Sequence, residues 1–283
     1  MSLIERILEL FCNENDISLE RFLRKKGISR RTLILLKRTP DGITRNGVLC
    51  RSVDILHAGD RIILRISESG GSTLPNPRLI IPVVYEDEDM ICYDKPCGVP
   101  VHQSSGHYGD TLANAFAARF PDKTFRAVNR LDKDTSGLCL AAKSRLGANI
   151  PHEKIKKVYY AVCCGKFSAP MRIDMPIGRE EGSAIKRTVR EDGKRAVTNV
   201  FPIDGNEKYT LLRIILETGR THQIRTHLSA AGFPLAGDML YGGDMQDMNR
   251  QALHCGEMYF FHPVSGREIS LSSEIPCDMK KLI

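Results

Sequence analysis

A segment rich in Ser, Gly and Pro divides this chain into two parts of unequal size. Residues 67–78 read SESGGSTLPNPR, a composition typical of a flexible, partly extended connection rather than of a helix or a buried strand. We therefore expect a small unit over residues 1–66, a linker over 67–78 and a large unit over 79–283. At these lengths each unit can form a hydrophobic core of its own.

Two short helices are predicted in the small unit. Ser18 and Ser29 each precede a helical pattern, and a serine oxygen accepts a hydrogen bond from a free N–H at a helix start. We expect helices over residues 19–26 and 30–37. A small sheet is expected after them, with turns at 41–42, 46–47 and 59–60 and the clearest strand at 61–66.

These predicted helices concentrate positive charge, in a chain whose net charge is +7. No acidic residue occurs between positions 21 and 38, whereas eight basic residues do: Arg21, Arg24, Lys25, Lys26, Arg30, Arg31, Lys37 and Arg38. Such a block predicts an acidic partner, nucleic acid first, because cations that neutralise phosphates release condensed counterions. A solvated basic helix face is the alternative.

The order of basic helices and small sheet resembles an S4-type RNA-binding domain of the α+β class. The resemblance covers residues 17–66 and includes the segment Ile28-Ser29-Arg30-Arg31, the Asn46-Gly47 turn and Gly59-Asp60. It implies that basic side chains of the two helices contact RNA phosphates, namely Arg24, Lys25, Lys26, Arg30 and Arg31. A generic basic helical hairpin remains the other interpretation.

Strand patterns and helix patterns are mixed along the large unit. The predicted strands are 90–94, 138–142, 159–164, 198–202, 209–217 and 257–261, and the predicted helices are 111–120 and 222–231. Since strands follow one another as often as helices, we predict an α+β fold with a mixed or antiparallel sheet. The chain contains no glycine-rich nucleotide-binding motif, so we expect no nucleotide cofactor.

Cysteine and histidine spacing argues against disulfides and metal. The nine cysteines are odd in number and contain no Cys-x-x-Cys pair, so reduced thiols in a cytoplasmic protein are expected. The histidines show no His-Glu-x-x-His spacing, and no metal site is expected. We also expect no membrane partner, because no run approaches the ~18 apolar residues that a span needs. A monomer is expected.

A turn in the large unit carries the most informative polar residues. Arg130 and Asp132 lie in a polar segment that is closed by Thr135-Ser136-Gly137 and followed by the hydrophobic strand pattern 138–142. An ionisable pair fixed to the end of a rigid strand is well placed for chemistry. The alternative is an ordinary turn aspartate that bonds nearby backbone amides.

Two further segments supply polar side chains. Tyr159 and Tyr160 point to opposite faces of a predicted strand, so only one of them can enter a cleft. Residues 216–242 combine a strand end at Thr218-Gly219 with a helix start that bears Arg220, His222 and Arg225. Gly219 is expected to allow a tight turn that displays Arg220. Donors at a helix start suit a phosphate or a carboxylate.

Together these segments resemble the large-ribosomal-subunit type of pseudouridine synthase. The segment Arg130-Leu-Asp-x-x-Thr-Ser-Gly137 resembles the catalytic loop of that family, and the full pattern spans about 79–263. It begins with Tyr93-Asp-Lys-Pro-Cys-Gly-Val-Pro-Val-His102 and ends with Gln251-Ala-Leu-His254 and Phe261-His-Pro263. One departure is Asn129, at a position where the family often has histidine.

The resemblance implies a role for each matching residue. Asp132 would be the catalytic carboxylate, acting at uracil C6, at ribose C1′ or through a glycal, and these routes remain open. Arg220 would pair with Asp132, and Tyr159 would lie against the uracil. Arg130 would fill the gap left by a flipped uridine, and Arg225 would bind RNA. The implied substrate is ribosomal RNA first and transfer RNA second, with no cofactor.

Two other functions compete with this interpretation. A hydrolase could use Asp132 and Asp134 as a carboxylate pair, but spacing of two within a tight turn rarely aims both groups at one bond. Aromatic sugar platforms are also poorly supplied, since Trp is absent. The second alternative is a non-catalytic RNA-binding or ribosome-assembly protein. A carboxylate close to bound phosphates would weaken such binding, so Asp132 favours an enzyme.

Overall fold

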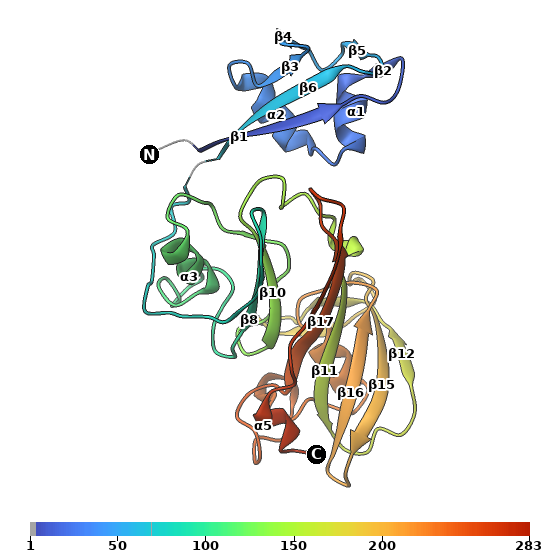
Figure 1. Ribbon diagram of the computed structural model, residues 1–283. Helices are drawn as coiled ribbons and strands as arrows, with labels where there is room; N and C mark the ends of the chain where they lie inside the picture. Colours follow the sequence, from blue (N-terminus) through green and yellow to red (C-terminus); the bar gives the residue numbers. More distant parts are fainter. Residues whose placement is uncertain (1–3, 69) are drawn as a thin grey trace.

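The computed structural model describes residues 4–68 and 70–283, and it shows a small unit stacked on one end of a larger one (Figure 1). The elements of the small unit are β1 (Ile4–Phe11), β2 (Ile17–Ser18), α1 (Leu19–Lys25), α2 (Arg30–Arg38), β3 (Ile43–Arg45), β4 (Val48–Leu49), β5 (Ile55–Leu56) and β6 (Arg61–Glu68). Its main sheet has the order β1-β6-β3-β4. Strand β6 continues two residues into the predicted linker.

Both predicted helices of the small unit form, and both predicted N-caps act as such. The hydroxyl of Ser18 accepts from the N–H of Arg21 at 3.4 Å, and that of Ser29 accepts from the N–H of Thr32 at 3.1 Å. Strand β1 was not predicted, because charged residues interrupt its apolar pattern. It nevertheless pairs with β6 along its whole length, and this pairing gives its backbone groups partners.

The large unit is built on one long mixed sheet. Its strands are β7 (Val83–Glu86), β8 (Met90–Lys95), β9 (Arg126–Ala127), β10 (Ser136–Ala142), β11 (Lys156–Cys164), β12 (Met171–Asp174), β15 (Val197–Gly205), β16 (Tyr209–Leu216), β17 (Leu253–Phe261) and β18 (Glu268–Ser272). The order is β12-β15-β16-β11-β17-β10-β8-β7, with β18 beside β17 and β9 beside β10. Only the short β10–β17 pairing is parallel among the described strands. The predicted α+β class with a mixed sheet is confirmed.

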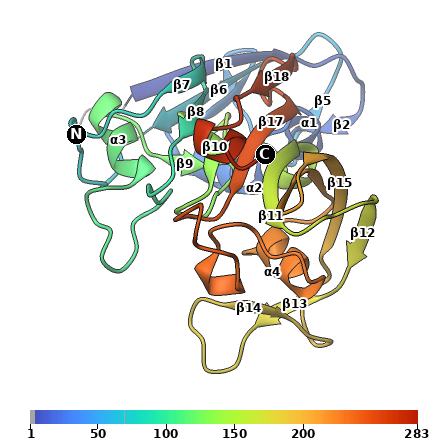
Figure 2. The same ribbon diagram turned by 90° about the horizontal axis from the view of Figure 1, so that it is seen from below.

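Helices and a hairpin cover parts of this sheet. The helical elements are α3 (Leu112–Arg119), α4 (Gln223–Ala230), α5 (Cys277–Lys280) and the 3₁₀ turns η1 (His152–Lys154) and η2 (Met239–Tyr241). The predictions for α3 and α4 were correct to within one residue at each end. A hairpin of β13 (Ile177–Arg179) and β14 (Arg187–Val189), which was not predicted, packs against α4 on the side away from the sheet (Figure 2).

Charged contacts join the two units. Glu68 at the end of β6 is buried, and its carboxylate accepts from Arg126 of β9 at 2.7 Å and from the backbone N–H of Arg145 at 2.5 Å. The side chain of Leu146 enters the hydrophobic core of the small unit. The small unit is therefore packed against the large one and not merely tethered to it.

No helix within residues 4–68 and 70–283 has the length and apolar character required to cross a membrane.

Candidate active site

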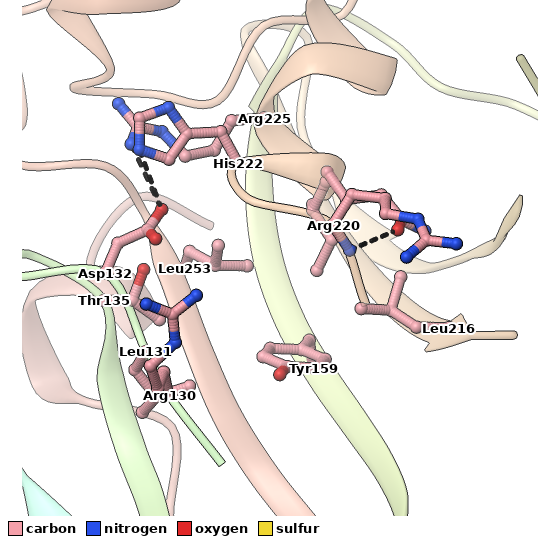
Figure 3. Close-up of a pocket in the computed structure, with 12 residues that line it drawn as sticks. Arg130, Leu131, Asp132, Thr135, Tyr159, Leu216, Arg220, His222, Arg225 and Leu253 are labelled. Atoms are coloured by element: carbon pink, nitrogen blue, oxygen red, sulfur yellow. Dashed lines mark hydrogen bonds and ion pairs between the residues drawn. The ribbon is translucent and has the colours of Figure 1, made fainter. Parts of the chain in front are cut away.

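One pocket contains most of the residues singled out in the large unit (Figure 3). It is lined by Arg130, Leu131, Asp132, Thr135, Tyr159, Leu216, Arg220, His222, Gln223, Ile224, Arg225 and Leu253. These side chains come from the β9–β10 loop, from β11, from the end of β16 and the start of α4, and from the start of β17. Segments far apart in the sequence thus meet around the Asp132 carboxylate.

Asn129 anchors the loop that carries Asp132. Its side chain is buried, where it donates to the carbonyl of Leu138 at 3.2 Å and accepts from the N–H of Leu140 at 2.6 Å. The amide therefore behaves as an extra backbone unit that ties the loop to β10. This position departs from the usual family pattern, and the structure gives its residue an anchoring task that needs one donor and one acceptor.

Two more buried side chains hold the loop beyond Asp132. Lys95 is fully buried and donates to the carbonyl of Lys133 at 2.9 Å. Gln251 donates to the hydroxyl of Thr135 at 3.0 Å. Burial is the main reason that the pKa of Lys95 falls to about 8. Since the loop is fixed on both sides of Asp132, the carboxylate is preorganised rather than mobile.

Gly137 lets β10 approach β17 at the base of the loop. Its φ of 103° lies in the region that glycine tolerates best, and a Cβ there would lie 2.3 Å from the carbonyl oxygen of Cys255. Next to it, Ser136 Oγ lies 2.9 Å from Nδ1 of His254 across the two strands. The Thr-Ser-Gly segment therefore fixes the junction of the two strands beneath the pocket.

Arg225, and not Arg220, is the cation beside Asp132. Nη1 of Arg225 donates to Oδ2 of Asp132 at 3.2 Å, while its Nε and Nη2 donate to the two oxygens of Asp238 at 2.7 and 2.8 Å. Burial opposes the charge of this guanidinium, but the two carboxylates raise the pKa of Arg225 above its ordinary value. Its side chain is only 7% exposed and lies against two carboxylates, and the RNA contact of Arg225 stays a prediction.

Arg220 lies at the rim of the same pocket with its guanidinium directed elsewhere. Its guanidinium points away from Asp132 (Figure 3). The Nε donates to the carbonyl of Arg195 at 3.0 Å, and the residue is exposed. The predicted pairing of Arg220 with Asp132 was therefore wrong. Gly219 does not explain the display of Arg220, because it has neither a positive φ nor a crowded Cβ position. The reason is that α4 begins three residues after Arg220, at Gln223.

Tyr159 is the tyrosine of β11 that reaches the pocket. It is buried there, whereas Tyr160 points to the other face of the sheet and its hydroxyl donates to Glu257. Burial raises the pKa of Tyr159 well above its usual value, with smaller contributions from Cys255 and Asp132. The pocket therefore presents a neutral phenol near pH 7.

His222 also faces Asp132, although it was predicted only as one of the donors at the helix start and not as a neighbour of Asp132. Its Nε2 lies 3.7 Å from Oδ2 of Asp132, and its Nδ1 lies 3.0 Å from the hydroxyl of Tyr241. The sequence signal was present, since His222 and Tyr241 both belong to the polar segment 216–242. Their spacing along the chain does not reveal that the two side chains touch. Asp238 was missed for the same reason.

The basic residues of the small unit lie outside this pocket. All eight basic side chains between positions 21 and 38 are exposed. Two of them have carboxylate partners within the small unit, Arg24 with Glu20 at 2.7 Å and Lys25 with Glu14 at 2.5 Å. Arg30 and Arg31 occupy the first turn of α2, where free N–H groups and the helix dipole also favour anions.

Comparison with known proteins identifies the family. A family model described as RNA pseudouridylate synthase matches residues 89–230. The uncharacterized RNA pseudouridine synthase YjbO of Bacillus subtilis is 36% identical over 279 residues, which cover 94% of this chain and 98% of that protein. The chain belongs to the RNA pseudouridine synthase family. As a pseudouridine synthase it is an isomerase whose substrate is RNA.

Other relatives agree with this assignment. Ribosomal large subunit pseudouridine synthase D of Pseudomonas aeruginosa is 34% identical over 264 residues, covering 85% of this chain and 82% of the relative. Among solved structures, Human RNA Pseudouridylate Synthase Domain Containing 1 superposes with a TM-score of 0.60 at 24% identity, over 71% of this chain and 85% of that one. The structural similarity shows that the two proteins share a fold.

Proposed function

We propose that this pseudouridine synthase converts uridine to pseudouridine in structured RNA, ribosomal RNA first, with Asp132 as the catalytic carboxylate. The observation that carries the proposal is the position of Asp132: its side chain is 28% exposed in the pocket and is held by Arg225 at 3.2 Å. Relatives named ribosomal large subunit pseudouridine synthase D support ribosomal RNA as the substrate.

The reaction sets the demands on these residues. The N1–C1′ bond of uridine must break, the base must turn, and a C5–C1′ bond must form while the C5 proton is lost. An aspartate supports this sequence by attack at C6 or C1′, or by assisting a glycal route. No electron acceptor or group acceptor is required, so we expect no cofactor.

Arg225 is proposed to position the carboxylate. Its guanidinium contacts Asp132 through Nη1 while Nε and Nη2 bind Asp238, so one planar group spans two carboxylates. This geometry fixes the orientation of Asp132 before the substrate arrives and needs no reorganisation during the reaction. Arg225 therefore takes the position at the carboxylate that the sequence assigned to Arg220.

Base flipping is proposed to depend on Arg130. Its side chain is exposed at the mouth of the pocket, two residues from Asp132. Taking a uridine out of its stack costs a few kcal/mol. A guanidinium that enters the vacated position offsets part of that cost by stacking and by contact with phosphates.

Tyr159 is proposed to lie against the flipped uracil. Because its pKa is raised well above 10, a phenolate is scarce near neutral pH. The ring therefore serves as an apolar surface for the base, and its hydroxyl remains a donor. Transfer of the C5 proton through this hydroxyl requires a second group that accepts the proton.

The test is tritium release from RNA labelled at uridine C5. Wild-type protein should release tritium, and Asp132→Asn should release none, because the amide is a poor nucleophile. Asp134→Asn is the matched control, since it removes a carboxylate from the same turn and should retain release. Equal release by the wild type and Asp132→Asn would remove Asp132 from the mechanism.

The same assay separates the alternatives. A carboxylate-pair hydrolase predicts that Asp134→Asn fails as completely as Asp132→Asn. A binding-only protein predicts no release by the wild type from any cellular RNA. Comparing pseudouridine positions in the RNA of cells with and without this gene would then name the target uridine.

The small unit is proposed to hold the RNA through α1 and α2, with Arg24, Lys25, Lys26, Arg30 and Arg31 on phosphates. Their exposure and the lack of acidic residues between positions 21 and 38 support this role. A cytoplasmic, monomeric enzyme remains our expectation.

A further inference from the structure

His222 has an unusual backbone conformation beside the reacting carboxylate. Its φ is 56° and its ψ is 20°, the left-handed region, immediately before α4. Such a conformation is unfavourable for a non-glycine residue, and it persists only where neighbouring contacts hold it. Here it turns the imidazole toward Asp132 (Figure 3). The other ring nitrogen lies beside the hydroxyl of Tyr241.

The hydroxyl of Tyr241 has a complete set of partners. It accepts from the backbone N–H of Arg187 at 2.9 Å and from the hydroxyl of Thr226 at 3.3 Å. It also lies 3.0 Å from Nδ1 of His222. A hydroxyl has two acceptor positions and one proton, so with both acceptor positions used its proton points to His222.

This count determines which imidazole nitrogen of His222 carries hydrogen. If Nδ1 accepts the proton of Tyr241, the neutral ring must carry its own hydrogen on Nε2. Nε2 is the atom that faces Oδ2 of Asp132 at 3.7 Å. That distance is longer than a hydrogen bond, but bonds of this kind often shorten only when the substrate is bound.

The surroundings keep His222 neutral. Burial is the largest effect that lowers its pKa, and Arg225 and Arg187 lower it further, whereas Asp132 and Asp238 raise it. The net shift is downward, so the ring is uncharged at pH 7. The ring centroid of Tyr241 also lies 4.9 Å from the guanidinium carbon of Arg225. The side chains of His222 and Arg225 therefore both lie beside Tyr241.

We infer that Tyr241 and His222 are positioning residues for Asp132: Tyr241 fixes the tautomer of His222, and His222 presents a neutral N–H donor to Oδ2. This inference rests on the proposed role of Asp132. Arg225 and His222 both approach Oδ2, which leaves Oδ1 as the oxygen that neither donor addresses. Oδ1 is then the atom that acts on the nucleotide.

The tautomer is measured on RNA-free protein labelled with ¹⁵N at histidine. Long-range ¹H–¹⁵N correlations distinguish a ring nitrogen that carries hydrogen from one that does not, and His222→Asn assigns the signal by its disappearance. Asn suits this test because it tolerates the left-handed backbone better than most residues. We expect hydrogen on Nε2 in the wild type and a mixture of tautomers in Tyr241→Phe.

The kinetic part compares two tyrosine variants. Tyr241→Phe keeps the ring beside Arg225 and removes only the hydroxyl. It should lower kcat roughly tenfold, because one hydrogen bond near a charged group is lost. KM should be nearly unchanged. Tyr209→Phe is the matched control, because its hydroxyl binds Asp247 at 2.9 Å outside the pocket. It should keep the wild-type rate.

Three results would overturn the inference: hydrogen on Nδ1 in the wild type, unchanged imidazole signals in Tyr241→Phe, or equal rates for the two tyrosine variants. Failure of the proposed function is seen separately, as no tritium release by the wild type. The imidazole signals are recorded without RNA, so they test the tautomer even in that case.

Discussion

The pocket and the small unit both depend on arginine, but they use it in opposite ways. In the pocket, Arg225 is buried and spans the carboxylates of Asp132 and Asp238. On the small unit, Arg30 and Arg31 are exposed on the first turn of α2. A buried, paired guanidinium determines where atoms lie, whereas an exposed one supplies a screened attraction for phosphates.

The largest effect is expected from removing the buried partner of Arg225. Asp238 is 1% exposed, and Asp238→Asn would leave most of the charge of Arg225 without its compensating carboxylate. The free energy of unfolding should fall by about 3 kcal/mol, as is usual when one member of a buried pair is lost. Urea denaturation measures it.

The matched control is Glu20→Gln, which breaks the exposed pair with Arg24. It should cost about 0.5 kcal/mol or less, because water and salt already screen that pair. Similar losses in the two variants would contradict the distinction between buried and exposed arginines.

Within the pocket, Arg225→Lys should lower kcat about a hundredfold, since an ammonium cannot contact Asp132 while also binding both oxygens of Asp238. Arg220→Lys should change kcat by less than about threefold, because Arg220 bonds a backbone carbonyl at the rim. Single-turnover tritium release measures both. The reverse order would restore Arg220 as the partner of Asp132.

Lys95 offers a pH-dependent test, as a buried cation bonded to two backbone carbonyls. Its pKa of about 8 lies below the ordinary 10.5. Between these values the unfolded chain binds more protons than the folded one, so stability rises with pH. The contribution of Lys95 to the free energy of unfolding should grow by about 2 kcal/mol from about pH 8 to about pH 10.

The measurement compares urea denaturation of the wild type and Lys95→Met across this range. Met has a similar length and does not titrate, so the difference between the two proteins isolates Lys95. A difference that stays constant with pH would show that Lys95 keeps its ordinary pKa.

The smallest effect is expected on the exposed face. Replacing Arg30 and Arg31 by Gln should weaken RNA binding roughly tenfold at moderate salt and reduce the slope of log affinity against log salt by about two. Replacing Lys166 and Lys280, exposed lysines of the large unit, is the control and should leave the slope unchanged. Loss of activity at saturating RNA would show that the arginines do more than attract phosphate.

Local sequence signals predicted the regular elements well. Ser18 and Ser29 cap helices as expected, and the helices at 112–119 and 223–230 were predicted to within one residue at each end. Strand β1 was missed because charged residues interrupt its apolar pattern, and the β13–β14 hairpin was missed because each of its strands has only three residues. Strand β1 is stabilised by pairing with β6, and the hairpin is stabilised by packing against α4, although their own sequences do not favour strands.

The site was predicted in its residue types but not in its pairings. Asp132 and Tyr159 do meet in one pocket, as the motifs implied. The choice between Arg220 and Arg225 did not depend on the start of α4, which was predicted to within one residue, but on which side chain the packed helix directs at Asp132. With the helix beginning at Gln223, Arg225 lies on its buried side and Arg220 precedes it.

The sequence by itself determined which chemical groups this enzyme has and their order along the chain, because turns, caps and motifs are local. The tertiary structure decided which groups touch. Asp132 and Arg225 are 93 residues apart, and Tyr241 reaches His222 across 19 residues. Such contacts depend on how β10, β11 and α4 pack, and packing is set by the whole core rather than by neighbouring residues.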